Sequence, residues 1–145
     1  EIVTGLYYRL TFDITLCNYF LEQTEGLTDD ETTRQRAEVR FIRALNNYYL
    51  MDMFGNPPYC DKVSTEKPQQ IQRADLFAKI EEELKEIGDD ATATLAQPLQ
   101  TTYGRVDRVA AWLLLARMYL NAEVYTGTPQ WKSQGICPKS DWFRL

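Results

Sequence analysis

The 145 residues suffice for one domain with a hydrophobic core, and 44% hydrophobic with 26% charged residues is ordinary for a folded globular protein. A formal net charge of −5 argues against nucleic acid as a partner, because phosphate binding needs a basic surface. The longest uncharged run in the most apolar predicted helix, 109–116, is far shorter than the ~20 apolar residues that cross a bilayer. No transmembrane segment is predicted.

The residue types also limit the chemistry. The sequence has no His, and its three cysteines, Cys17, Cys60 and Cys137, show no CxxC spacing. These facts exclude a Cys/His zinc site and Ser–His or Cys–His catalysis, and an all-Cys zinc site lacks one ligand. We therefore expect no metal and no cofactor. Cys17 is predicted to be a small buried hydrophobe, whereas Cys60 and Cys137 lie in predicted loops and are free to pair only in an oxidising compartment.

The first two helices have clear limits. Apolar residues at helical spacing predict a helix over residues 3–23, which Gly26 ends. The next helix is predicted over 29–54. Thr28 and Glu31 have the spacing of a capping box at its start, and Gly55 followed by two prolines forbids its continuation.

Apolar residues cover most of the surface of this second helix. Two neighbouring apolar faces predict that it packs between other helices. The first face carries Ala37, Phe41, Ala44, Tyr48 and Met51, and the second carries Ile42, Leu45, Tyr49 and Met53. The only continuous polar strip is narrow and is predicted to lie at the surface, and we call it the arginine ridge: Arg36, Arg40, Arg43 and Asn47. Its arginines either pair with nearby acidic residues at a solvated edge or form a site for an anion or a partner protein.

The rest of the chain alternates between loops and helices. Residues 56–70 are rich in Pro, Ser, Thr, Lys and Gln, which predicts an irregular surface segment. Residues 73–87 form a clean amphipathic pattern with one apolar face, so this third helix is expected on the outside of the fold, with Gly88 as its stop. A long connection over 89–103 follows.

A fourth helix is predicted from about Arg105 to about residue 124, and apolar residues cover nearly its whole circumference. We expect it to be the second buried helix, lying beside the second helix so that Phe41 and Trp112 share one core. Residues 125–145 show no helical period and are predicted to be loop, with a short helix near 129–134.

The second and fourth helices share an order of features: a charged start, spaced alanines, a central aromatic residue and a final Tyr-Leu pair. Such helix pairs are typical of tetratricopeptide-like arrays, although the full repeat signature is absent. The predicted fold class is therefore all-α, with about four main helices and long loops in tetratricopeptide-like hairpins (an α-α superhelix).

Two motifs point to a more specific family. The run RAEVRFIRA at 36–44, with Asp52, Gly55 and Pro58 after it, resembles the signature of the SusD/RagB family. So does Gly104-Arg105-Val106, followed by the Tyr119-Leu120-Asn121-Ala122 segment and a Tyr-Thr-Gly-Thr run at 125–128. The resemblance covers roughly residues 33–131.

The resemblance carries clear implications. Members of that family are lipid-anchored proteins on the outer face of the outer membrane that bind oligosaccharides or polysaccharides and cover a SusC-like TonB-dependent transporter. They are not enzymes, and they are several times longer than this chain. The resemblance implies a helical core over 1–131, serving mainly as scaffold, and an irregular tail over 132–145. Whether the chain is a truncated piece or a short member stays open.

Three functions are compatible with the sequence to different degrees. For a glycan-binding module, Trp131 and Trp142 are the candidate contacts, since sugars stack on aromatic rings, although both rings are more easily explained by packing against the last helix. A tetratricopeptide-like protein-interaction module without sugar binding is the alternative, with the arginine ridge as its interface. A glycosidase with paired carboxylates is disfavoured, because the acidic residues lie mainly on a solvated helix face or at a helix start.

Overall fold

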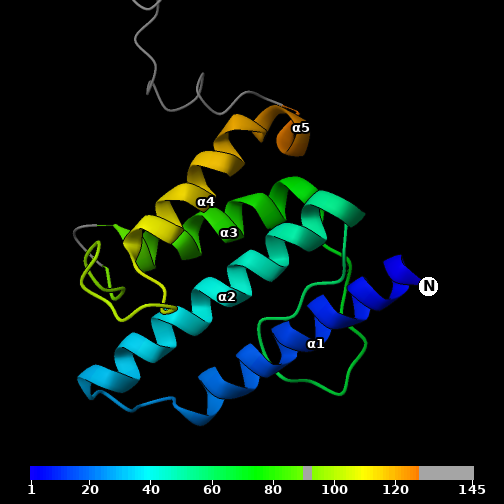
Figure 1. Ribbon diagram of the computed structural model, residues 1–145. Helices are drawn as coiled ribbons and strands as arrows, with labels where there is room; N and C mark the ends of the chain where they lie inside the picture. Colours follow the sequence, from blue (N-terminus) through cyan, green and yellow to red (C-terminus); the bar gives the residue numbers. More distant parts are fainter. Residues whose placement is uncertain (90–92, 128–145) are drawn as a thin grey trace, which may run out of the picture.

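The computed structural model describes residues 1–89 and 93–127. Over these residues the chain forms α1 (Ile2–Gln23), α2 (Asp30–Phe54), α3 (Arg73–Gly88), α4 (Arg108–Leu120) and the short α5 (Ala122–Thr126), with no strand among them. The four long helices stack in chain order, each against the next (Figure 1). This arrangement confirms the all-α, tetratricopeptide-like class.

The layer order differs from the predicted one. The expectation that α2 and α4 lie side by side with α3 outside them is wrong, because α3 lies between the two (Figure 1). The apolar face of α3 is completely buried and joins the main core. The residues on this face are Leu76, Phe77, Ile80, Leu84 and Ile87. A single apolar face is enough for α3 to contact both neighbouring helices, because α2 and α4 both direct core residues, such as Ala44 and Ala111, toward that face.

The fully buried character predicted for α4 is also wrong. Its inner face places Ala111, Leu114 and Met118 in the core. On its outer face Leu113 is 66% and Leu120 is 87% exposed. The helix also ends earlier than predicted, at Leu120, and α5 continues after a break at Asn121.

Trp112 does not share the core with Phe41 as predicted. Phe41 belongs to the main cluster, whereas Trp112 is exposed at the edge of α4. There its indole Nε1 donates a hydrogen bond of 2.9 Å to the carbonyl oxygen of Gly88. The ring therefore connects α4 to the end of α3 without filling the core.

Local residues explain where the helices begin and end, but two of the predicted helix ends are wrong. The capping box predicted at Thr28 is wrong: α2 begins one residue later, where the Asp29 carboxylate accepts a 2.9 Å hydrogen bond from the amide of Thr32. Gly55 ends α2 with a positive φ, as expected. Gly88 is not a stop but the last residue of α3, where a Cβ atom would lie 3.0 Å from that of Ala111.

A smaller cluster joins the first two helices. Leu10 and Ile14 of α1 pack on Leu50 of α2, and Tyr7 meets Phe54 edge to face at 5.3 Å. The second apolar face predicted for α2 is only partly covered by this contact, since Ile42 and Met53 remain exposed.

The last helix of the described residues, α5, is bound to α2 through a tyrosine. The Tyr125 hydroxyl donates a 2.7 Å hydrogen bond to the Asp52 carboxylate, and its ring meets Tyr48 edge to face. Burial, together with these neighbours, raises the pKa of Tyr125 far above its ordinary value. The hydroxyl therefore stays protonated and keeps its role as a donor.

Candidate functional site

The three arginines of the arginine ridge are partly exposed, and Arg40 and Arg43 pair with acidic residues as one of the two predicted alternatives had it. Arg40 and Arg43 both reach across to the Glu83 carboxylate of α3, and Arg40 also pairs with Glu86. Arg36 donates to the carbonyl oxygen of Leu21 at the end of α1. The three arginines therefore hold α2 to its neighbours on both sides.

The electrostatics of this contact follow from its burial. Desolvation would lower the pKa of Arg40, but the hydrogen bonds and charges of Glu86 and Glu83 outweigh it and raise the pKa. The side chains of Arg43 and Glu83 are both mostly buried, which strengthens their attraction relative to an exposed pair.

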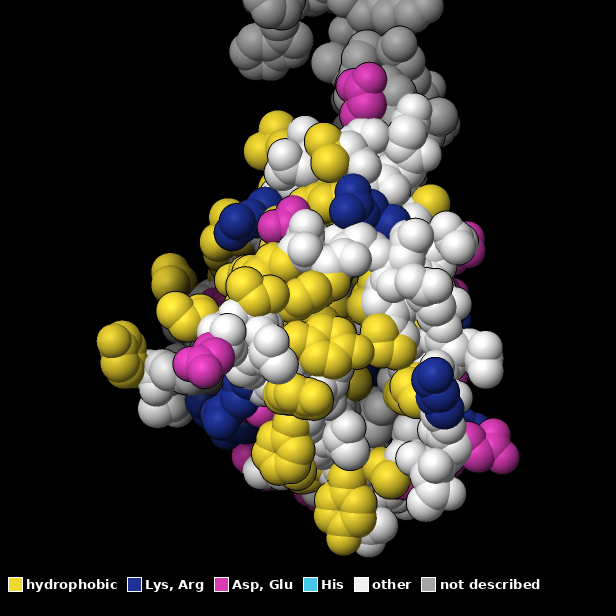
Figure 2. Space-filling view, turned by 90° about the vertical axis from the view of Figure 1, so that its right-hand side faces the viewer, with side chains coloured by type: hydrophobic (Ala, Val, Ile, Leu, Met, Phe, Trp, Pro, Cys, Tyr) yellow, Lys and Arg dark blue, Asp and Glu magenta, His cyan; other side chains and the backbone are white. Residues whose placement is uncertain are grey.

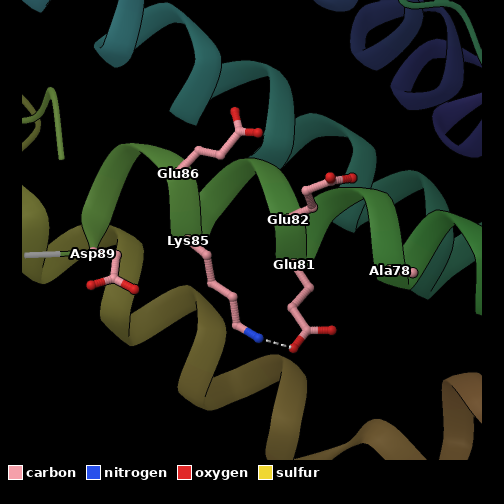
Figure 3. A pocket seen from close by; sticks show the side chains of 6 residues that line it. All are labelled: Ala78, Glu81, Glu82, Lys85, Glu86 and Asp89. Carbon is pink, nitrogen blue, oxygen red and sulfur yellow. Dashed lines mark hydrogen bonds and ion pairs between the residues drawn. The ribbon is translucent and has the colours of Figure 1, made fainter. Parts of the chain in front are cut away.

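The outward face of α3 carries a shallow acidic surface (Figure 3). Glu82 and Glu86 point toward α2, whereas Glu81, Lys85 and Asp89 point toward α4. Glu81 accepts hydrogen bonds of 2.6 Å from Lys85 and from the hydroxyl of Tyr119. The cluster therefore connects α3 to its two neighbours, and its geometry fits a structural role.

A cleft of about 200 Å³ lies between α1, α2 and the 56–70 segment, which crosses back over α1 (Figure 1). This segment is held by backbone hydrogen bonds such as Ile71 N to Pro57 O, and by Asn18 of α1, which donates to the carbonyl oxygen of Cys60. The cleft is lined by Thr11, Ile14, Thr15, Asn47, Leu50, Pro58, Cys60, Ser64, Glu66 and Pro68.

Apolar side chains also reach the surface. On α1, Tyr8, Phe12, Leu16 and Tyr19 are at least half exposed. Figure 2 shows hydrophobic side chains gathered over the middle of the face where α1 begins and α2 ends, with charged side chains around them. Exposed apolar side chains gathered on one face in this way are typical of a contact with further polypeptide.

The two tryptophans predicted as glycan contacts are not among the described residues. Trp131, Trp142 and Cys137 lie outside the described residues, as does the helix predicted near 129–134. Among the described residues Cys60 forms no disulfide and is partly buried, and Cys17 forms none and is buried as predicted.

Several other kinds of site are absent from the part of the chain that the structure describes. Within 1–89 and 93–127, no three His, Cys, Asp or Glu side chains converge as a metal site would require. Over the same residues, no helix combines the length and the apolar character needed to cross a membrane.

Comparison with known proteins identifies the family. A sequence model for the family described as "Starch-binding associating with outer membrane" matches residues 4–120. The chain belongs to the SusD/RagB family. It is 49% identical over 122 residues to the starch-binding protein SusD of Bacteroides thetaiotaomicron, which covers 84% of this chain and 21% of that protein. The chain thus spans about a fifth of the length of this relative.

Solved structures of SusD-like proteins share the fold. One is a SusD-like carbohydrate-binding protein from Bacteroides fragilis, with a TM-score of 0.75 at 22% identity, covering 92% of this chain and 27% of that one. Another is the surface glycan-binding protein A from Bacteroides uniformis, with a TM-score of 0.68 at 23% identity, covering 97% and 33%. At this identity the likeness establishes the helical fold alone.

The structural roles of two buried asparagines, Asn18 and Asn47, were not predicted from the sequence. Asn18 is 1% exposed and bonds both to Cys60 and to Arg43, so that it joins α1, α2 and the 56–70 segment. Asn47, assigned to the surface strip, is only 4% exposed, because the 56–70 segment covers it. An asparagine within an apolar helical run is the one local signal that pointed to them.

Proposed function

We propose that this chain is the helical scaffold of a glycan-binding protein of the outer-membrane surface. The observation that carries the proposal is the 49% identity with a starch-binding protein over most of this chain, joined to a family model over residues 4–120. Because the chain corresponds to about a fifth of that relative, the activity belongs to the full-length protein.

The full-length protein acts by binding and not by catalysis. Starch or a related oligosaccharide or polysaccharide is its ligand, and a SusC-like TonB-dependent transporter is its partner. A lipid anchor on the full-length protein places it on the cell surface. The supporting feature is the family match over residues 4–120.

Affinity electrophoresis of the full-length protein tests the proposal. In a gel containing amylopectin, the protein should migrate more slowly than in a gel without polysaccharide, whereas a non-binding protein of similar size should not. Unchanged migration with amylopectin and with a panel of other glycans would contradict it.

The two candidate tryptophans are tested by the same measurement. Trp131 and Trp142 are replaced together by Ala, and circular dichroism checks that the helix content is unchanged. If the variant is no longer retarded by amylopectin, the sugar contact is assigned to these two rings. If retardation persists, the rings pack against the protein, and the glycan contacts lie elsewhere in the full-length protein.

A protein-interaction module without sugar binding is the second candidate. The exposed apolar surface on α1 favours it, because such surfaces mark contacts with other polypeptides. Its test is co-purification with a SusC-like transporter from solubilised outer membranes. For this candidate the transporter should be captured while amylopectin causes no retardation, and replacing Arg40 and Arg43 should reduce capture if the arginine ridge is the interface.

A further inference from the structure

The loop between α3 and α4 exposes a leucine in a strained conformation. Leu99 is 94% exposed, and among the described residues it is the only one other than glycine with a positive φ, of 62°. It follows Pro98 in a turn that is closed by a 3.1 Å hydrogen bond from the amide of Gln100 to the carbonyl oxygen of Gln97. Proline at the second position and a positive φ at the third are features of a type II turn, in which Gly or Asn is the usual third residue.

The strain at Leu99 is not offset by packing among the described residues. A leucine at positive φ is disfavoured because its Cβ atom crowds the backbone, whereas glycine has no such atom. At this exposure the side chain of Leu99 buries almost no apolar surface that could offset the cost. Strained residues of this kind cluster at ligand contacts and switch regions. Leu99 is therefore a candidate contact for another molecule.

The turn itself is held firmly on the body of the protein. Before it, Leu95 is 2% exposed in the main core. After it, the Asp107 carboxylate accepts a 3.1 Å hydrogen bond from the amide of Leu99 itself. Arg105 then donates two hydrogen bonds, of 2.9 and 3.1 Å, to the Glu38 carboxylate of α2. The side chain of Leu99 is thus presented at a fixed position, so little conformational entropy is lost when a partner binds it.

The loop that carries Leu99 has no charged side chain. Residues 93–104 contain no Asp, Glu, Lys or Arg, although these make up 26% of the whole chain. Tyr103 in the same loop is fully exposed, and it and Leu99 are the two most exposed large hydrophobic residues that the structure describes. Depletion of charged residues together with aromatic side chains distinguishes the centre of a protein–protein interface from the rest of a surface. The loop therefore fits an uncharged protein surface better than a charged ligand.

We propose that Leu99 is an anchor that enters an uncharged apolar pocket of a partner protein, with Tyr103 as a second contact. This inference rests on the proposed function, which supplies the partner, a SusC-like transporter. Burial of an exposed leucine is favourable because it removes apolar surface from water, and this gain is available only where the side chain meets a pocket. A glycan is the poorer fit, since the leucine side chain has no donor or acceptor for sugar hydroxyls.

Binding of the purified, detergent-solubilised transporter to the immobilised full-length protein tests the proposal. Leu99→Gly should raise the Kd by at least about tenfold, because the anchor is lost. The free energy of unfolding of the full-length protein should not fall, because glycine adopts the positive φ without strain. Leu27→Gly is the matched control: Leu27 is an exposed leucine of the loop between α1 and α2 without a positive φ, and its change should leave the Kd within about twofold. Leu99→Met keeps the apolar bulk and should retain binding within about threefold.

The other outcomes overturn the anchor and say why. A fall in the free energy of unfolding of the Leu99→Gly variant would show that Leu99 packs within the full-length protein and not on a partner. Loss of retardation by amylopectin in that variant would place Leu99 on the glycan. Equal rises in the Kd for Leu99→Gly and Leu27→Gly would refute a specific contact. If the unaltered protein does not bind the transporter, the partner in the proposed function is wrong and this proposal falls with it, whereas transporter binding that survives Leu99→Gly refutes this proposal alone.

Discussion

Gly88 lies where α3 approaches α4, and the space for a Cβ atom there is taken by Ala111. Gly88→Ala should therefore destabilise the chain by about 1–3 kcal/mol, even though Ala favours a helix. Gly5→Ala is the matched control, because Gly5 is also helical and has nothing within 4 Å of its Cβ position, so it should stabilise by about 0.5–1 kcal/mol. Urea unfolding measures both. A stabilised Gly88→Ala variant would show that the two helices can separate at no cost.

Cys17 should make the free energy of unfolding depend on pH in the alkaline range. Burial raises the pKa of its thiol from 9.0 to about 11. Between these values the unfolded chain has lost the proton that the folded chain keeps, so the free energy of unfolding should fall as pH rises from 9 to 11, by about 2 kcal/mol from this group. Urea unfolding at both pH values measures the fall, which should be smaller in Cys17→Ala. An identical fall in that variant would remove Cys17 as its cause.

At the scale of elements, Glu83 joins two helices through one carboxylate. Glu83→Gln keeps the shape but removes the charge that Arg40 and Arg43 share, and it should cost about 2 kcal/mol, because Arg43 is then left largely buried without its counter-charge. Glu82→Gln is the control: Glu82 is exposed on the same helix and should change stability by less than about 0.5 kcal/mol. If thermal unfolding gave equal shifts for the two variants, α2 and α3 would not depend on this contact.

The two faces of α4 should respond differently to truncation. Leu114 is 6% exposed in the core, and Leu114→Ala should cost about 2–5 kcal/mol. Its neighbour Leu113 lies on the outer face, so Leu113→Ala should change the free energy of unfolding of this chain by less than about 0.5 kcal/mol. Urea unfolding of both variants tests this assignment, and the reverse order of effects would mean that α4 is rotated about its axis.

At the scale of the whole molecule, charge limits the partners. With a formal net charge of −5 and the arginines of the ridge engaged within the fold, the chain should not bind duplex DNA at about 0.15 M salt. Fluorescence anisotropy of a short labelled duplex measures this. Saturable binding at roughly micromolar protein would contradict it.

The local features of the fold were predictable because their causes are local. Helical spacing of apolar residues placed α1, α2 and α3 within one residue of their observed limits at each end. The start of α2 was displaced by one residue, since Thr28, Asp29 and Asp30 are all acceptable caps and only the folded backbone selects among them. The end of α4 at Leu120 had no comparable signal in the sequence.

The arrangement of the helices was not predictable from the sequence. A pattern of apolar residues predicts that one face of a helix is buried, but it does not predict which element covers that face. Leu113 and Leu120 look like core residues, but no described element covers them. Arg40 and Asn47 look like surface residues, but α3 and the 56–70 segment cover them. The candidate cleft was missed for the same reason, as its walls come from three separate segments.

The amino-acid sequence by itself determined the helices, the main core residues of α3 and, through its motifs, the family, since these depend on neighbours along the chain. Only the tertiary structure decided that α3 lies between α2 and α4, that the arginines connect helices, and that Asn47 lines a cleft beside α1. The physical reason is that burial and charge pairing depend on residues distant in sequence, such as Arg43 and Glu83, which come together only when the helices pack.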